Sequence, residues 1–157
     1  MESIGGTSRS FSEESSYFDV IVIGAGLSGV GAGVRLQRDC PDSSFAILER
    51  REAIGGTWDI FRYPGIRSDS DMHTLGYYFK PWSAEKAIAD GTAIREYVNA
   101  TADEYGVREH IRFQHQLKSA NWQSELGQWI LSVESASGMV EYRCNVLLMC
   151  AGYKRIS

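Results

Sequence analysis

The chain has 157 residues, with a hydrophobic content of 43% and a charged content of 23%, which is ordinary for a globular protein built on one core. Its formal net charge of −4, with no basic stripe, argues against nucleic acid as a partner. No apolar run reaches the length of a membrane span, so we expect no transmembrane segment.

The first sixteen residues are rich in Ser, Gly and Glu and lack the apolar core of a secretory signal. We therefore expect a disordered N-terminal extension over residues 1–16 and a single domain over residues 17–157. The three cysteines, Cys40, Cys144 and Cys150, form neither a Cys-x-x-Cys pair nor a metal-binding spacing. Such a sparse set is typical of a reducing compartment, so we expect a cytoplasmic protein without a metal site, with peripheral membrane association left open.

The first strong pattern begins at Val20–Ile23, a short apolar run that leads directly into Gly24-x-Gly26-x-x-Gly29. Apolar residues then recur at helical spacing, which predicts a helix that runs to about residue 39. Strand, glycine turn and helix together form the geometry that a dinucleotide pyrophosphate needs. Gly24 permits the tight turn, Gly26 lets the phosphates approach, and Gly29 lets the helix lie close to the strand.

A second strand is predicted for residues 44–48, and Glu49 follows it, twenty residues after Gly29. An acid at this place in a βαβ unit accepts hydrogen bonds from an adenosine ribose. Its charge would repel a 2′-phosphate, which favours FAD over NADP, whereas Arg50 and Arg51 point weakly the other way. The alternative is a glycine-rich turn in another α/β protein, with Glu49 at a solvated strand end.

Residues 50–70 are predicted to form a long ordered loop, which is uncommon in a compact domain unless the loop is functional. Asp69 follows a Tyr-Pro-Gly turn in this loop, and we expect Arg62 or Arg67 beside it. The Asp69 carboxylate would then stay ionised and could orient a cation at an active site. The alternative is a helix N-cap, because a short helix is predicted to begin near Asp71.

The rest of the chain is predicted to hold one long helix and several strands. The helix follows Gly91-Thr92 and is stopped by Gly106, and a short strand is expected at residues 111–115. Alternating apolar residues predict a three-stranded antiparallel meander, with strands at residues 121–123, 129–133 and 139–142. A last apolar strand, residues 145–150, ends in Ala151-Gly152, where a second backbone segment could approach a ligand.

This order predicts an α/β fold, a doubly wound Rossmann-type parallel sheet with the meander covering one face, as in FAD-binding domains of the glutathione-reductase type. Two blocks in the loop are more specific: Gly55-Gly56-Thr57-Trp58, and Arg62-Tyr63-Pro64-Gly65-Ile66-Arg67-Ser68-Asp69. Both blocks and their spacing resemble the flavoprotein Baeyer–Villiger monooxygenases, most of all their ethionamide-monooxygenase-type branch. The likeness runs from about residue 18 to residue 153, which is nearly all of this chain but only the front of such an enzyme.

The resemblance implies a set of site residues. At the FAD pyrophosphate and the adenosine these are Gly24, Gly26, Ser28 and Gly29, Glu49 at the ribose, and the Leu117 backbone at the adenine. Gly56, Thr57, Trp58, Asp59 and Ile60 would wall the ribityl and flavin end, while Arg67, Ser68 and Asp69 would lie by the flavin ring and the nicotinamide, with Arg67 and Asp69 catalytic. Ala151 and Gly152 would lie beside FAD through their backbone, because the family usually carries Ser or Thr where Ala151 stands.

The resemblance also implies a reaction, an oxygenation with FAD, NADPH and O2 that converts a ketone to an ester or oxygenates a soft sulfur or nitrogen atom. No second Gly-x-Gly-x-x-Gly for NADPH follows, and the family's fingerprint motif is absent. We therefore expect the N-terminal, FAD-binding part of such an enzyme, truncated before the NADPH domain and inactive alone.

Two alternative functions stay open. The first is another flavoprotein with two dinucleotide sites, such as an N-oxygenating monooxygenase; a disulfide reductase would need a redox cysteine pair, which the sequence lacks. The second is a non-catalytic FAD- or nucleotide-binding remnant or subunit, which would bind the cofactor without turnover.

Overall fold

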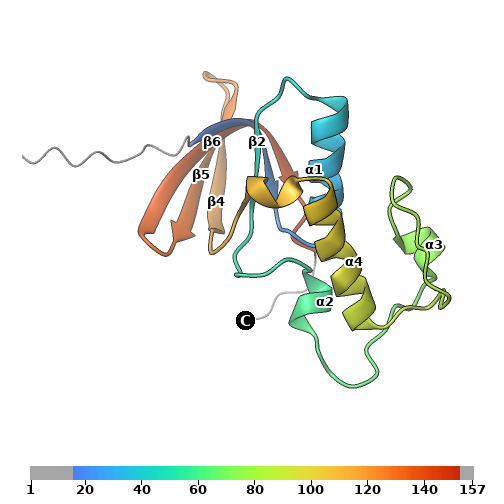
Figure 1. Ribbon diagram of the computed structural model, residues 1–157. Helices are drawn as coiled ribbons and strands as arrows, with labels where there is room; N and C mark the ends of the chain where they lie inside the picture. Colours follow the sequence, from blue (N-terminus) through green and yellow to red (C-terminus); the bar gives the residue numbers. More distant parts are fainter. Residues whose placement is uncertain (1–15, 153–157) are drawn as a thin grey trace, which may run out of the picture.

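A computed structural model describes residues 16–152 and has one six-stranded sheet in the order β3-β2-β1-β6-β5-β4, with α1 and α4 side by side next to it (Figure 1). The elements in chain order are β1 (Tyr17–Ile23), α1 (Leu27–Asp39), β2 (Phe45–Leu48), α2 (Thr57–Ile60), α3 (Met72–Leu75), α4 (Gly91–Glu104), η1 (Val107–His110), β3 (Ile111–Arg112), β4 (Gln116–Gln123), β5 (Gln128–Ser135) and β6 (Gly138–Met149). The expected disordered extension lies, apart from Ser16, outside the described residues. Within residues 16–152, no helix is both long and apolar enough to cross a membrane.

The strand β6 joins the two halves of the sheet. It runs antiparallel to β5 over residues 138–144 and parallel to β1 over residues 143–149. The sequence prediction of two separate strands here, 139–142 and 145–150, is therefore wrong. Neither Arg143 nor Cys144 is a residue type that favours a turn, and each pairs with β1 on one side and with β5 on the other. The extended backbone therefore continues through both residues.

The two faces of the parallel strands are covered differently, as predicted. Val22 and Ile47 belong to the cluster that contains the buried residues of α1 and α4. On the other face Ile21 packs in a separate cluster with Leu131 and Val133 of β5. Because the side chains of a strand alternate between faces, this division places the helices on one side and the curled meander on the other. The predicted α/β fold with a meander over one face is confirmed.

The ends of β2 and β3 decide several element boundaries. Gln114 adopts a left-handed backbone with a φ of 56° and donates its N–H to Arg51 O at 3.0 Å, so β3 ends at Arg112 rather than at residue 115. The meander strand β4 then begins at Gln116, earlier than the predicted residue 121. The predicted loop over residues 50–70 also contains the single turn of α2, which is too short for apolar periodicity to reveal.

The helix α4 begins and ends where capping rules place it. Asp90 is its N-cap, and the Asp90 carboxylate accepts a hydrogen bond from Ala93 N at 2.8 Å. Gly106 follows the C-terminus with a φ of 67°. In the same way, the Asp71 side chain caps the short helix α3 by accepting from Thr74 N.

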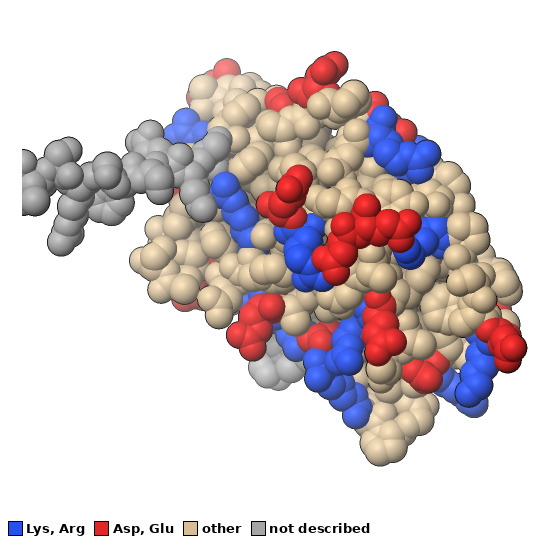
Figure 2. All heavy atoms as spheres, viewed as in Figure 1, with Lys and Arg blue, Asp and Glu red and all other residues tan. Residues whose placement is uncertain are grey.

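Charges of both signs lie close together on the face that Figure 2 shows. The structure also contains several exposed ion pairs, among them Arg35–Asp39, Arg108–Asp103, Lys118–Glu134 and Arg143–Glu141. Pairs between exposed partners contribute little to stability, because water screens them and the long side chains lose entropy.

Replacing Asp90 by Ala should lower the free energy of unfolding by about 1 kcal/mol, because the first turn of α4 loses its side-chain acceptor. Asp90→Asn is the matched control, since Asn caps a helix about as well as Asp. Urea unfolding of both variants measures the effect. Equal midpoints for Asp90→Ala and the parent chain would contradict the assigned cap.

Candidate functional site

Two glycine turns meet beyond the carboxyl ends of β1 and β6. Gly55 N donates to Ala25 O at 3.0 Å, and a Cβ on Gly56 would lie 3.0 Å from Gly26 Cα. The two turns therefore stack backbone against backbone. They lie where the sheet order reverses, with β2 on one side of β1 and β6 on the other, which is the usual place for a ligand in an α/β sheet.

Two glycines of the first turn are required by packing. Gly24 has a φ of 102°, and a Cβ there would lie 2.7 Å from Cys150 O. A Cβ on Gly29 would lie only 1.8 Å from Gly24 O, so this glycine lets α1 start close against the end of β1. These geometric roles are the ones that the Gly-x-Gly-x-x-Gly pattern predicted.

Gly26 is different, because nothing in the fold demands a glycine there. Its φ of −84° is open to any residue, and a Cβ would only touch Gly56 at 3.5 Å, an ordinary contact. Gly26 is also the N-cap of α1 and provides no side-chain cap. The first turn of α1, with the exposed Ser28, thus presents backbone N–H groups at a surface kept clear of side chains.

Glu49 is buried, with 7% of the residue exposed, so the alternative of a solvated strand end is wrong. One carboxylate oxygen accepts from Ala25 N at 2.8 Å and the other accepts from Arg51 N at 2.9 Å. The side chain thereby ties the end of β2 to the first glycine turn. Each oxygen keeps a second lone pair that a ligand hydroxyl could use.

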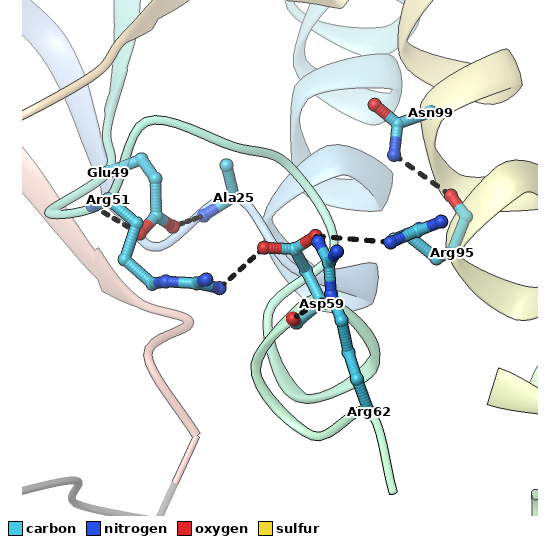
Figure 3. A network of polar contacts seen from close by, with 7 residues as sticks. All are labelled: Ala25, Glu49, Arg51, Asp59, Arg62, Arg95 and Asn99. Atoms are coloured by element: carbon cyan, nitrogen blue, oxygen red, sulfur yellow. Dashed lines mark hydrogen bonds and ion pairs between the residues drawn. The ribbon is translucent and has the colours of Figure 1, made fainter. Parts of the chain in front are cut away.

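Asp59 lies at the centre of an arginine network behind the second glycine turn (Figure 3). Its side chain is 3% exposed and is within ion-pair distance of Arg51 at 2.8 Å, of Arg95 at 3.7 Å, and of Arg62. We expected Arg62 or Arg67 beside Asp69, but Arg62 pairs with the buried Asp59 carboxylate instead. Asp69 is exposed and forms no ion pair with any described residue.

The loop that carries Arg67, Ser68 and Asp69 is fixed to the start of α4. Arg67 forms an antiparallel bridge with Asp90, and Ser68 N donates to Ala89 O at 2.9 Å. The buried Ser68 hydroxyl bonds to the backbone of Ser70. As a result, the exposed side chains of Arg67 and Asp69 flank an anchored serine. The N-cap alternative does not apply to Asp69, because the N-cap of α3 is Asp71.

The same loop also lies next to α2. A Cβ on Gly91 would lie 2.9 Å from Ile66 and 3.6 Å from Trp58, so this glycine lets the two segments meet over the start of α4. The sequence-predicted residues 56–60 and 67–69 are therefore brought together. Thr57, Trp58 and Ile60 are half-buried.

Three other predicted residues, Ala151, Gly152 and Leu117, lie at different parts of the sheet. Ala151 and Gly152 are exposed directly after Cys150, whose N–H donates to Ile23 O at 2.8 Å beside the first turn. Leu117 lies in β4, where it pairs with Val133 and packs under the meander. The structure thus places Ala151 and Gly152 at the glycine turns and Leu117 on the meander side.

The thiols near the site are packing groups. Burial raises the pKa of both the Cys150 and Cys144 thiols, which keeps them protonated at neutral pH. This agrees with the absence of a Cys-x-x-Cys pair in the sequence.

The sequence reading missed Arg95, which takes part in the Asp59 network from α4. It follows the buried Ile94 on the helix and carries no motif signal of its own. Only the packing of α4 on α2 brings it to Asp59.

Comparisons with known proteins agree with this geometry. A family model described as an NAD(P)-binding Rossmann-like domain matches residues 22–84. The FAD-containing monooxygenase EthA of Mycobacterium tuberculosis (strain ATCC 25618 / H37Rv) is 52% identical over 137 residues, and the probable FAD-binding monooxygenase AlmA of Acinetobacter baylyi is 43% identical over 138 residues. Each match covers 87% of this chain, but the chain spans only 28% of the length of either relative.

Solved structures give the same picture. An oxidized steroid monooxygenase bound to NADP superimposes with a TM-score of 0.78 at 29% identity, over 87% of this chain and 26% of its own. An ε-caprolactone-bound cyclohexanone monooxygenase superimposes with a TM-score of 0.77 at 25% identity, over 87% of this chain and 27% of its own. The resemblance read from the two loop blocks is confirmed.

Replacing Gly29 by Ala should lower the free energy of unfolding by about 3 kcal/mol or prevent folding, because backbone atoms cannot yield to a Cβ at 1.8 Å. Ser28→Ala, at the exposed neighbouring position, is the control and should shift stability by less than about 0.5 kcal/mol. Soluble yield and urea unfolding measure both variants. A Gly29→Ala protein as stable as Ser28→Ala would show that the turn is looser than described.

Proposed function

We propose that this chain, a homologue of the N-terminal part of FAD-containing monooxygenases, binds FAD across its paired glycine turns. In the full-length protein it would serve an NADPH- and O2-dependent monooxygenase of the Baeyer–Villiger type. The observation that carries this proposal is Gly26, a glycine that the fold does not require, at the uncapped N-terminus of α1.

The pyrophosphate would bind at that helix N-terminus. The backbone N–H groups of the first turn of α1 have no partners inside the helix, and the helix dipole favours negative charge there. A side chain at position 26 would occupy the approach to them, between the two glycine turns. FAD fits this cradle, with Gly24, Gly26, Ser28 and Gly29 around its phosphates.

The adenosine would bind toward Glu49. A buried carboxylate with free lone pairs accepts from ribose hydroxyls and repels a 2′-phosphate, which favours FAD over NADP at this site. Arg51 does not offset this preference, because its guanidinium pairs with Asp59. The Leu117 backbone would then meet the adenine, and the Ala151 and Gly152 backbone would border the cofactor.

The ribityl chain and flavin would lie along residues 56–60 and reach the anchored loop at residues 67–69. Thr57, Trp58 and Ile60 would wall the flavin and exclude water from it. Asp69, with its exposed carboxylate, would orient a cationic group such as the nicotinamide, with Arg67 beside it. When bound, FAD supplies the redox chemistry with NADPH and O2, and the chain supplies position and a dry wall.

The substrate of the full-length protein would be a ketone converted to an ester, or a compound with a soft sulfur or nitrogen atom. We propose a reducing, cytoplasmic location, which suits protonated and unpaired thiols. We further propose that the 157-residue chain by itself binds FAD without turnover.

Gly26→Ser is the variant that tests the cradle. Serine is a good N-cap at the extended backbone of position 26, so the free energy of unfolding should hold or rise by a few tenths of a kcal/mol. Its side chain would fill the phosphate approach, so the Kd for FAD should rise at least about tenfold, equivalent to about 1.4 kcal/mol. Titration of the purified chain with FAD, followed by flavin fluorescence, measures this.

Arg38→Ala, at the exposed far end of α1, is the control and should bind FAD like the parent chain. Displacement of FAD by ADP would place the adenine end on the βαβ unit. Absence of saturable FAD binding by the parent, or equal affinity in Gly26→Ser, would overturn the proposed function.

A further inference from the structure

We infer that Asp59 is a positioning residue for the cofactor: its carboxylate sets the second glycine turn against the first by holding three arginines, and it does not itself touch FAD. The inference rests on the proposed FAD site. It departs from the role that the family resemblance implies, in which Asp59 belongs to the wall of the flavin pocket.

The burial of Asp59 requires this kind of compensation. A carboxylate that is 3% exposed is costly unless it is paired. Two of the guanidinium groups come from other segments, Arg51 from the loop after β2 and Arg95 from α4, and the third comes from Arg62, three residues after Asp59. The Asp59 charge therefore ties these segments to one point.

That point lies immediately behind the second glycine turn. A Cβ on Gly55 would lie 3.0 Å from Asp59 Cβ and 3.2 Å from Arg95 Cγ, and Asp59 N donates to Gly56 O at 3.1 Å. The front of the same turn rests on the first turn through the bond from Gly55 N to Ala25 O. A change in the Asp59 pairing would therefore shift the surface on which the cofactor lies.

The network also reaches the adenosine end of the site. Arg51 donates its backbone N–H to Glu49 at 2.9 Å and pairs with Asp59 through its side chain, and Glu49 accepts from Ala25 N (Figure 3). A continuous path of polar contacts thus connects the first glycine turn, Glu49, Arg51 and Asp59.

Both carboxylate oxygens of Asp59 pair with arginines, so we infer that other groups contact the flavin. Oδ1 pairs with Arg62 and Arg95, and Oδ2 lies 2.8 Å from Arg51 Nη1. The Oδ2 and Nη1 atoms make an ion pair without hydrogen-bond alignment. This contact depends on charge rather than direction, so an uncharged amide of the same shape cannot replace the carboxylate.

Asp59→Asn is the direct test, with FAD and ADP as separate probes. ADP reaches only Glu49 and the first turn, whereas FAD also needs the second turn. We expect the Kd for FAD to rise about tenfold or more, as misplacement by a fraction of an ångström weakens binding. The Kd for ADP should change less than about twofold. Gly26→Ser should instead weaken both ligands.

Hydrogen exchange of the ligand-free chain supplies an independent readout. Backbone amides of residues 55–62 should exchange faster in Asp59→Asn, while those of β1 keep their protection. Asp39→Asn, which removes the acid of the exposed pair with Arg35, is the matched control and should change neither readout. Arg95→Gln leaves Asp59 with two arginines, so this variant should fold well and weaken FAD binding by a smaller factor. It provides the test if Asp59→Asn proves insoluble.

Three outcomes would overturn the inference. FAD affinity unchanged in Asp59→Asn and in Arg95→Gln would show that the network does not act on the site. An equal loss for FAD and ADP, with faster exchange throughout, would show a structural role only. If the parent chain binds no FAD, the proposed function fails by itself, and unchanged exchange at residues 55–62 would then refute the positioning role separately.

Discussion

The approach of two glycine turns, backbone against backbone, is the constraint on which the rest of the site depends. Gly55 N bonds to Ala25 O, and the Gly26 and Gly56 backbones are in contact. A side chain on Gly56 would press on Gly26 Cα at 3.0 Å, so this close contact holds the loop after β2 over the carboxyl ends of β1 and β6. The position of α2, and the loop that follows it, are consequences of this contact.

Buried charge then holds the turns in place. Glu49, at the end of β2, accepts a hydrogen bond from the backbone of the first turn, and Asp59 forms ion pairs with arginines behind the second turn. Such ions are costly to bury, and well-packed apolar groups would often be as stable. The presence of two buried carboxylates beside the turns favours a role in specifying geometry, which a cofactor that spans both turns would require.

The structural relatives indicate which parts of the fold persist when the amino-acid sequence differs. A steroid monooxygenase with 29% identity has nearly the same fold over 87% of this chain. The parallel strands, the helix that follows the first glycine turn, and the meander are thus compatible with many sequences. Gly56 imposes a stricter demand, because its φ is 53° and a Cβ there would lie 3.0 Å from Gly26 Cα.

The two loop blocks that resemble the Baeyer–Villiger monooxygenases have different structural roles. Gly55–Trp58 contains the second glycine turn, and Arg62–Asp69 contains the Ser68 segment anchored at the start of α4. The sequence shows both blocks, but it does not show where the fold places one relative to the other.

The sequence by itself determined the βαβ unit, the roles of Gly24 and Gly29, the end of α4 at Gly106, and the resemblance to FAD-containing monooxygenases, because each rests on local spacing or on residues adjacent in the chain. Only the tertiary structure decided that β6 is a single strand, that Glu49 is buried, and that Arg62 pairs with Asp59 rather than Asp69. The first two outcomes depend on strands far apart in sequence, and the third depends on the burial of Asp59 among Arg51, Arg62 and Arg95, of which only Arg62 follows Asp59 closely in the chain. A carboxylate draws the arginines of whichever segments pack around it, and one-dimensional spacing does not contain that information.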